Sequence, residues 1–318
     1  MKGKGLRIFV TVGQIVVFAL GLSPTWAATA TSKGVPTSAH GYSIFDETMV
    51  DMTWRQVEKA AKEGAVILFP IGVIEEHGPH MGLGVDTYLA YLKCKLVRQG
   101  LETRGIQALI APPFYWGINN NTGSFPGSFT VRKETMKAVL HDTLASFRRW
   151  GFDYLFVINH HGDTEHNLTI LDAIKEARMD TGMRAFYVLP EFDAKVRFRL
   201  TGREHHVLLV PAPESQERPE YLDVHAGRGE TGLMAHYFPD QVKVEVARTL
   251  KSTNLTLRDL AEWDHSWSDA RKMTPMGYFG DPANFDPEAS RQKMEDFVNQ
   301  VVNLIESFMK AKGLMQAH

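Results

Sequence analysis

The sequence has only one cysteine, Cys94, among its 318 residues. A single cysteine cannot form an intrachain disulfide, and a metal site built from several thiolates is excluded. The sequence also lacks an excess of charge of either sign, with 35 basic and 37 acidic residues. Because nucleic-acid binding needs a basic surface that neutralises phosphates, we do not expect this chain to bind nucleic acid.

Long apolar runs are scarce as well, and the one that stands out lies near the N-terminus. Basic residues within the first seven positions precede an apolar stretch over residues 8–22, and Thr25 and Ala27 then offer small side chains. This order is typical of a secretory signal peptide over residues 1–27. An uncleaved membrane anchor is the alternative, but the stretch is short for a membrane span. We therefore expect a periplasmic or secreted protein with no membrane attachment after cleavage.

The rest of the chain predicts a single α/β domain over residues 43–318, preceded by a flexible segment over 28–42 that is rich in small and polar residues. Short apolar runs predict strands at 65–71, 108–111, 154–158 and 185–189, and amphipathic patterns predict helices at 54–63, 87–101, 133–150, 167–181, 230–237 and 287–312. Apolar strands that alternate with amphipathic helices indicate a three-layer sandwich with a mostly parallel sheet. The proline-containing segment 190–222 is less regular, and it predicts either a lid or a surface decoration.

Histidine and carboxylate residues follow two of the predicted strands directly. Glu75 and His77 come after the first strand, with Asp86 farther on, and His161 and Asp163 come after the third. In an open parallel sheet, the loops at the carboxyl ends of the strands form the ligand crevice. Residues i and i+2 face the same way in extended backbone, so each pair can converge on one point. A shell of imidazole and carboxylate groups suits Zn²⁺ or Mn²⁺, and the sequence thus predicts a metal site.

Four segments resemble, in the family order, the signatures of the creatininase (creatinine amidohydrolase) family. They are PIGVIEEHGPH at residues 70–80, FPGS at 125–128, NHHGD at 159–163 and HAGRGET at 225–231. The resemblance implies a creatininase-like fold and a metal-dependent hydrolase that opens a cyclic amide or cleaves a small linear amide. It also implies a homo-oligomer, a hexamer by analogy with the family.

The same resemblance implies two divalent metal ions per chain, Zn²⁺ and/or Mn²⁺. Glu75 and His161 are expected to bind one ion, His77 is expected to bind the other, and Asp86 is expected to bridge both. A metal-activated water is then expected to attack the substrate carbonyl.

The family leaves two candidates, Asp163 and Glu230, for the carboxylate that completes the second ion's site. We favour Asp163, because it shares a face with His161, and we expect Glu230 to act as the base. Glu230 could instead merely stabilise the first turn of a helix. His225 matches the family's catalytic histidine and is expected to protonate the leaving nitrogen or stabilise the tetrahedral oxyanion, or else to orient the ligands. Tyr221 is the nearest aromatic residue that could contact substrate.

Two departures from the family pattern concern the substrate side of the expected site. Asn121 and Thr122 stand where the family usually has a Glu-His pair. The resemblance therefore supports hydrolytic chemistry for this chain more strongly than it supports specificity for creatinine. Two other functions stay open. One is a metal-dependent isomerase or enolising enzyme that acts on a polyol or sugar derivative, and the other is a non-catalytic periplasmic metal-binding protein.

Overall fold

The structure is a computed structural model that describes residues 43–211, 220–264 and 266–314. The predicted signal peptide and the segment 28–42 lie outside the described residues. Contacts divide the chain into two units, and every described residue belongs to the unit Tyr42–His318. None of the described helices combines the length and apolarity that a membrane span requires.

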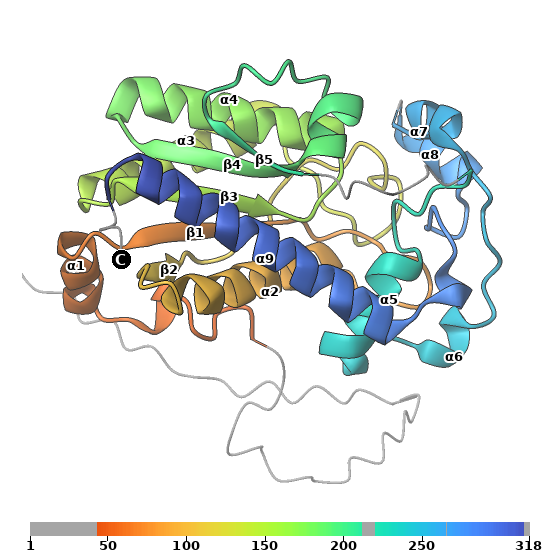
Figure 1. The fold of residues 1–318 in the computed structure, drawn as a ribbon. Coiled ribbons are helices and arrows are strands. Elements are labelled where there is room, and N and C mark those ends of the chain that lie inside the picture. Colours follow the sequence, from red (N-terminus) through yellow and green to blue (C-terminus); the bar gives the residue numbers. More distant parts are fainter. Residues whose placement is uncertain (1–42, 212–219, 265, 315–318) are drawn as a thin grey trace, which may run out of the picture. The chain divides into compact units, whose positions relative to one another are not determined.

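A parallel sheet of five strands, in the order β2-β1-β3-β4-β5, forms the centre of the described chain (Figure 1). The strands are β1 (Val66–Ile71), β2 (Ala108–Ile110), β3 (Tyr154–Asn159), β4 (Arg184–Pro190) and β5 (Val207–Val210). Ile71 pairs with Asn159, so the carboxyl ends of β1 and β3 lie level with each other. The loops that follow these two strands consequently leave the sheet at the same edge.

Helices cover both faces of the sheet. The long helices are α2 (Val85–Glu102), α3 (Lys133–Arg149), α4 (Thr164–Thr181) and α9 (Pro287–Ala311), and the shorter ones are α1 (Trp54–Lys62), α5 (Arg228–Tyr237), α6 (Val244–Ala247), α7 (Leu257–Trp263) and α8 (Trp267–Met273). Figure 1 shows α3 and α4 on one side of the sheet and α2 and α9 on the other. The predicted three-layer α/β sandwich is thus confirmed.

Side chains of β1 alternate between two hydrophobic cores, as the period of two in a strand requires. Phe69 and Ile71 pack in the core that α3 and α4 cover. Leu68 packs in the core that α2 and α9 cover. All six residues of β1 are buried, which explains why this strand is apolar throughout.

At the carboxyl end of β1, Gly72 lies directly against the backbone of the first turn of α2. A Cβ atom on Gly72 would lie 2.8 Å from the carbonyl carbon of Asp86, so a side chain here would force the strand and the helix apart. Backbone contact therefore holds Asp86 next to the loop that follows β1.

The sequence predicts less regular structure over 190–222, but the described part of this segment forms a strand and a helical turn. It supplies the edge strand β5, which pairs with β4, and the short π-helical turn Asp193–Arg197 (η2). β5 has only four residues and three of them are only partly buried, so its pattern is weaker than that of the central strands.

Candidate metal centre

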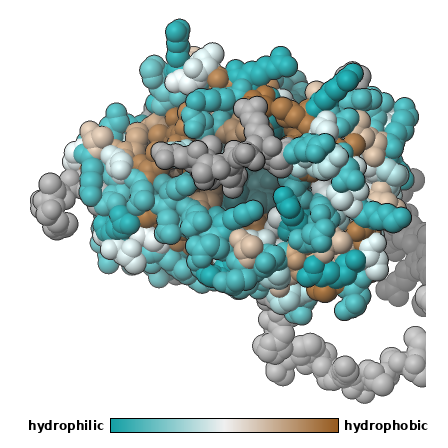
Figure 2. Space-filling view, turned by 45° about the vertical axis from the view of Figure 1, so that its right-hand side comes forward, coloured by the Kyte–Doolittle hydropathy of each residue, from teal (hydrophilic) through white to brown (hydrophobic). Residues whose placement is uncertain are grey.

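The four residues predicted as ligands at the two strand ends lie close together in the structure. Glu75 and His77 belong to the loop after β1, Asp86 lies in the first turn of α2, and His161 follows β3. All four side chains are buried, with exposed fractions between 0% and 6%. Figure 2 turns the right-hand side of Figure 1 forward and shows a hollow with mainly hydrophilic walls on that face.

The first group consists of Glu75, Asp86 and His161. Its ligand atoms lie within 4.8 Å of one another. The Nδ1 atom of His161 lies 2.9 Å from Oε1 of Glu75 and 3.0 Å from Oδ2 of Asp86. The other ring nitrogen, Nε2, donates to the backbone carbonyl of Ile118 at 2.9 Å, which leaves Nδ1 to face the carboxylates.

The second group consists of His77, Asp86 and Glu230. The Nε2 atom of His77 lies 3.5 Å from Oδ1 of Asp86 and 3.7 Å from Oε2 of Glu230. Nδ1 of His77 lies 3.2 Å from the backbone carbonyl oxygen of Glu75, to which it donates in the matching tautomer. Asp86 thus presents one oxygen to each group, the arrangement that a bridging carboxylate requires.

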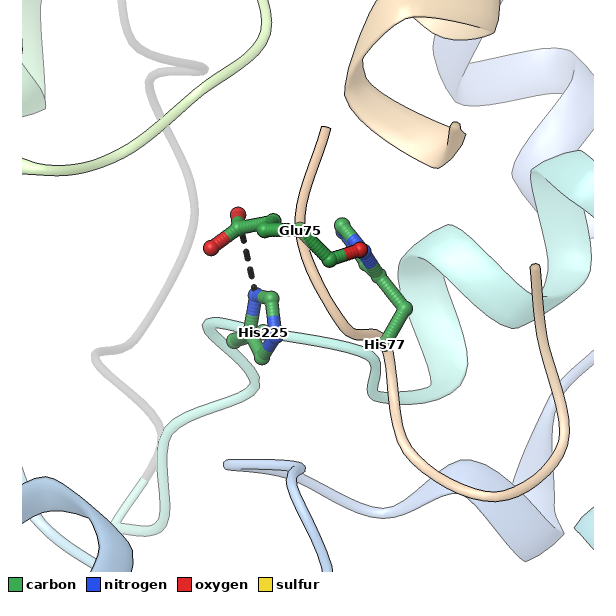
Figure 3. A group of neighbouring side chains, drawn as sticks. All are labelled: Glu75, His77 and His225. Atoms are coloured by element: carbon green, nitrogen blue, oxygen red, sulfur yellow. Dashed lines mark hydrogen bonds and ion pairs between the residues drawn. The ribbon is translucent and has the colours of Figure 1, made fainter. Parts of the chain in front are cut away.

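The third group consists of Glu75, His77 and His225, whose side chains lie together in Figure 3. The Nδ1 atom of His225 lies 3.7 Å from Oε1 of Glu75, and its Nε2 atom lies 2.8 Å from the backbone carbonyl oxygen of Glu76. The His225 and His77 rings are tilted against each other with centroids 4.3 Å apart. The structure therefore brings the predicted catalytic histidine to the edge of the predicted metal site.

Buried imidazoles and carboxylates shift one another's pKa values in this centre. Burial lowers the pKa of His161, but the carboxylates of Glu75 and Asp86 outweigh burial and raise that pKa well above its ordinary value. Burial raises the pKa of Asp86, and the neighbouring imidazoles of His161 and His77 more than reverse this rise, so the pKa lies well below its ordinary range. Each buried charge in this centre is balanced by a neighbouring charge of opposite sign. Removing several charges from water costs free energy, and perturbed pKa values of this kind are concentrated at functional sites.

Divalent cations fit this donor set. His77 Nε2 is buried and has no hydrogen-bond partner among the described residues. Both His77 and His161 use one ring nitrogen on a backbone carbonyl and aim the other at carboxylate oxygens. Imidazole nitrogens fixed in this way, beside carboxylates and with no thiolate, suit Zn²⁺ or Mn²⁺.

Asp163, our preferred ligand from the sequence, lies outside all three groups. It is the N-cap of α4, where Oδ1 accepts from the backbone N–H of His166 at 2.9 Å. Its Oδ2 accepts from the backbone N–H of Asn120 at 2.7 Å. The i, i+2 rule assumes extended backbone, whereas this side chain turns toward the helix that begins after it. The geometry favours Glu230 as the further carboxylate, in place of Asp163.

Glu230 and the turn that carries His225 are connected. Oε2 of Glu230 accepts from the backbone N–H of Ala226 at 2.6 Å, and Ala226 has a φ of 49°, a left-handed conformation that is unfavourable for alanine. On the other oxygen, Oε1 lies 3.3 Å from Nε2 of His160. Tyr221, predicted to contact substrate, is 45% exposed and belongs to none of the three groups.

Sequence reasoning missed several residues that orient this centre. Thr122 donates its hydroxyl hydrogen to Oε2 of Glu75. Its neighbour Asn121 donates to Oδ1 of Asp264 at 2.6 Å. The only signal in the sequence was that these two positions depart from the usual family pattern, which did not indicate what they contact.

Comparisons with known proteins place this chain among similar sequences and folds. A family model described as "Creatininase: Creatinine amidohydrolase" matches residues 50–305. A creatinine amidohydrolase from Pseudomonas putida is 28% identical over 205 residues, which are 61% of this chain and 73% of that protein. A mycofactocin precursor peptide peptidase from Mycolicibacterium smegmatis is 23% identical over 261 residues, which are 82% of this chain and 91% of that protein.

A third relative matches a shorter stretch. The 3-dehydro-scyllo-inosose hydrolase of Thermotoga maritima is 30% identical over 113 residues, 35% of this chain and 34% of that protein. Among solved structures, a creatinine amidohydrolase has a TM-score of 0.61 at 21% identity and covers 82% of this chain and 97% of its own. Another, described as "Creatininase Mn", has a TM-score of 0.61 at 20% identity and covers 82% of this chain and 98% of its own. These structures share the fold.

Proposed function

The chain belongs to the creatininase family of hydrolases, and we propose that it is a metal-dependent amidohydrolase that opens a cyclic amide or cleaves a small linear amide. The observation that carries this proposal is that Asp86 belongs to two buried ligand groups and turns one oxygen to each. Two relatives are named as an amidohydrolase and a peptidase, and both names describe cleavage of an amide C–N bond.

We propose that two divalent ions, Zn²⁺ and/or Mn²⁺, bind in this centre. Glu75 and His161 would hold one ion, His77 and Glu230 would hold the other, and Asp86 would be shared by both. Similar solved creatininases are described as a Mn form and as a Zn-Zn form. Bound ions of this kind polarise a substrate carbonyl and lower the pKa of water.

His225 is the proposed proton donor for the leaving nitrogen. Its Nε2 atom is engaged by the Glu76 backbone carbonyl, so its Nδ1 atom is the one that faces the centre. Burial lowers the pKa of His225, but the carboxylates of Glu75 and Glu76 outweigh burial and raise it to about 10. A histidine that holds its proton at neutral pH is suited to act as a general acid.

Of the two carboxylates considered for the second ion's site, Glu230 has the more suitable surroundings. Both oxygens of Asp163 accept backbone hydrogen bonds, whereas Oε1 of Glu230 faces the imidazole of His160. Burial raises the pKa of Glu230, and His160 and His77 bring it down to about 2. The low pKa keeps Glu230 ionised at neutral pH, as a carboxylate must be to hold a metal ion.

The test is turnover by metal-loaded protein. Metal-free protein is loaded with Zn²⁺ or Mn²⁺ and assayed against a panel of lactams, linear amides and inososes. Amide hydrolysis that depends on added metal, and that is lost in His161→Ala but kept in the surface variant His141→Ala, is the expected result. Turnover of inososes alone would favour the isomerase or enolising enzyme instead. Firm metal binding without turnover of any member of the panel would favour the non-catalytic metal-binding protein.

We also propose that residues 1–27 are removed during export, that the mature protein is periplasmic or secreted, and that it forms a homo-oligomer. The basic, apolar and small residues at the N-terminus support export, and family membership supports oligomerisation. Sequencing of the mature N-terminus should begin near residue 28, and light scattering should give a multiple of the chain mass. A mature protein that retains residues 1–27, or that is monomeric, contradicts the corresponding part.

A further inference from the structure

A buried arginine lies beside the metal centre and has no place in the chemistry proposed above. Arg197 is the last residue of η2, and its guanidinium lies against Gly162, the residue that follows the ligand His161. A Cβ atom on Gly162 would lie only 2.8 Å from Nη1 of Arg197. Glycine at this position therefore leaves room for the guanidinium next to the loop that carries a ligand.

The guanidinium of Arg197 is held between two carboxylates without a close contact to either. Its side chain is 10% exposed. Nη1 lies 3.9 Å from Oδ1 of Asp193, and Nη2 lies 3.8 Å from Oδ2 of Asp264. Both distances are longer than a hydrogen bond. Nε is buried and has no hydrogen-bond partner among the described residues.

Both carboxylates, Asp193 and Asp264, also interact with other residues. Asp264 accepts a hydrogen bond from Nδ2 of Asn121 at 2.6 Å. Burial raises the pKa of Asp193, and the charges of both Arg197 and Lys93 oppose that rise, so Arg197 is not the only cation that acts on Asp193. The two aspartates thus position the guanidinium from either side and leave its hydrogen-bond donors unused.

An arginine of this kind is expected to have a ligand. The guanidinium stays charged at all ordinary pH values and carries five N–H donors in a planar fork, which matches a carboxylate in a bidentate contact. A buried donor without a partner, such as Nε of Arg197, destabilises a protein, and a bound oxyanion can remove that penalty.

We propose that Arg197 binds a carboxylate of the substrate, so that the natural substrate is an amide that carries an acidic group close to the bond that is cleaved. This inference rests on the proposed amidohydrolase function and narrows its substrate class. Asp193 and Asp264 act as positioning residues, because they hold Arg197 and do not themselves contact the substrate.

The test compares two probes that differ in one group. Glutarate has two carboxylates, whereas glutaramate has one carboxylate and one carboxamide, so each can place a carboxylate at the metal ions. Calorimetric titration of Zn²⁺-loaded protein should show that glutarate binds about tenfold or more tightly than glutaramate, as expected for one added charge-assisted contact. Equal binding of the two probes by the unmodified protein would overturn the proposal.

Variants at two arginines complete the test. Arg197→Gln should reduce the preference for glutarate to within about twofold, and Arg197→Lys should keep part of it, because the charge remains but the fork is lost. Arg203→Gln is the control. Arg203 is exposed and precedes the edge strand β5, so this variant should keep the full preference for glutarate.

Full preference in a folded, metal-loaded Arg197→Gln protein contradicts the proposal. If Arg197→Gln does not fold, the Arg197→Lys variant is measured in its place. An unchanged preference for glutarate in Arg197→Lys would then contradict the proposed role of Arg197. Failure of amide hydrolysis, in contrast, is detected by the substrate panel and concerns the proposed function alone.

Discussion

The Nε2 atom of His161 lies 2.9 Å from the backbone carbonyl oxygen of Ile118, and this contact determines which ring nitrogen faces the carboxylates. His77 is oriented in the same way by the backbone carbonyl of Glu75. Because backbone atoms hold both rings, no single side-chain substitution can remove these orienting acceptors. The orientation of both imidazole rings is therefore set by the path of the chain itself.

Asp86→Asn should be the most damaging single change at a ligand. Asparagine keeps the shape of the side chain but removes the charge that both groups share, so the protein should lose most of both ions. Elemental analysis after gel filtration measures this loss. Asp142→Asn, at an aspartate whose side chain is 86% exposed, is the control and should keep the full metal content. Retention of two ions by Asp86→Asn would show that Asp86 does not bridge.

Glu230→Gln and Asp163→Ala should behave differently. Glu230→Gln should lose about one of two ions, because its carboxylate faces His77. Asp163→Ala should keep both ions but lose about 1 kcal/mol of unfolding free energy, because it removes the N-cap of α4. Metal content and urea denaturation distinguish the two effects. The reverse pattern, with metal lost only from Asp163→Ala, restores the original preference from the sequence.

His225→Asn should separate catalysis from metal binding. Removal of the proposed proton donor should reduce turnover by about 10²–10⁴-fold while both ions and the folded state remain. Turnover of the best amide in the panel and metal content are measured on the same preparation. Undiminished turnover would limit His225 to orienting its neighbours, and loss of an ion would identify it as a ligand through the third group.

Metal uptake should release protons. The raised pKa values of His77 and His161 favour the protonated imidazoles in the metal-free protein, and a cation must displace those protons. Metal uptake should therefore release protons, and metal affinity should rise with pH. Titration calorimetry in buffers of different ionisation enthalpy counts the protons. Uptake without proton release would mean that these histidines are already neutral.

The stability of the metal-free protein should fall as the pH rises, whereas metal affinity should increase. A histidine with a raised pKa stabilises the fold fully below its ordinary pKa, and that contribution is lost as the pH rises through the raised value. Metal-free protein should therefore melt at a lower temperature as the solution becomes alkaline. A melting temperature that rises steadily with alkaline pH contradicts this prediction.

The central strands could be predicted from the sequence almost residue by residue. A strand was predicted at 65–71, and β1 is Val66–Ile71, because burial on both faces demands a continuous apolar run. The edge strand β5 lies in the segment 190–222, for which the sequence predicts only less regular structure, because a strand of four residues, three of them partly buried, carries little pattern.

The candidate centre could be predicted only where its residues follow predicted strands. Glu75 and His161 were found in this way, since parallel strands end at one edge of the sheet. The local rule failed at Asp163, because helix capping competes for a short carboxylate. Thr122 lies in a loop and Arg197 lies at the end of η2, and the paths of both segments depend on tertiary packing, which the sequence pattern does not encode.

The contact between Gly72 and Asp86 has an evolutionary consequence. Two backbones touch there, so the spacing between the segments that carry Glu75 and Asp86 does not depend on the size of any side chain. Hydrophobic residues elsewhere in the two cores are then free to drift without moving these two carboxylates. Substitutions that change side-chain size in either core therefore need not change the distance between these two segments, as long as residue 72 remains glycine.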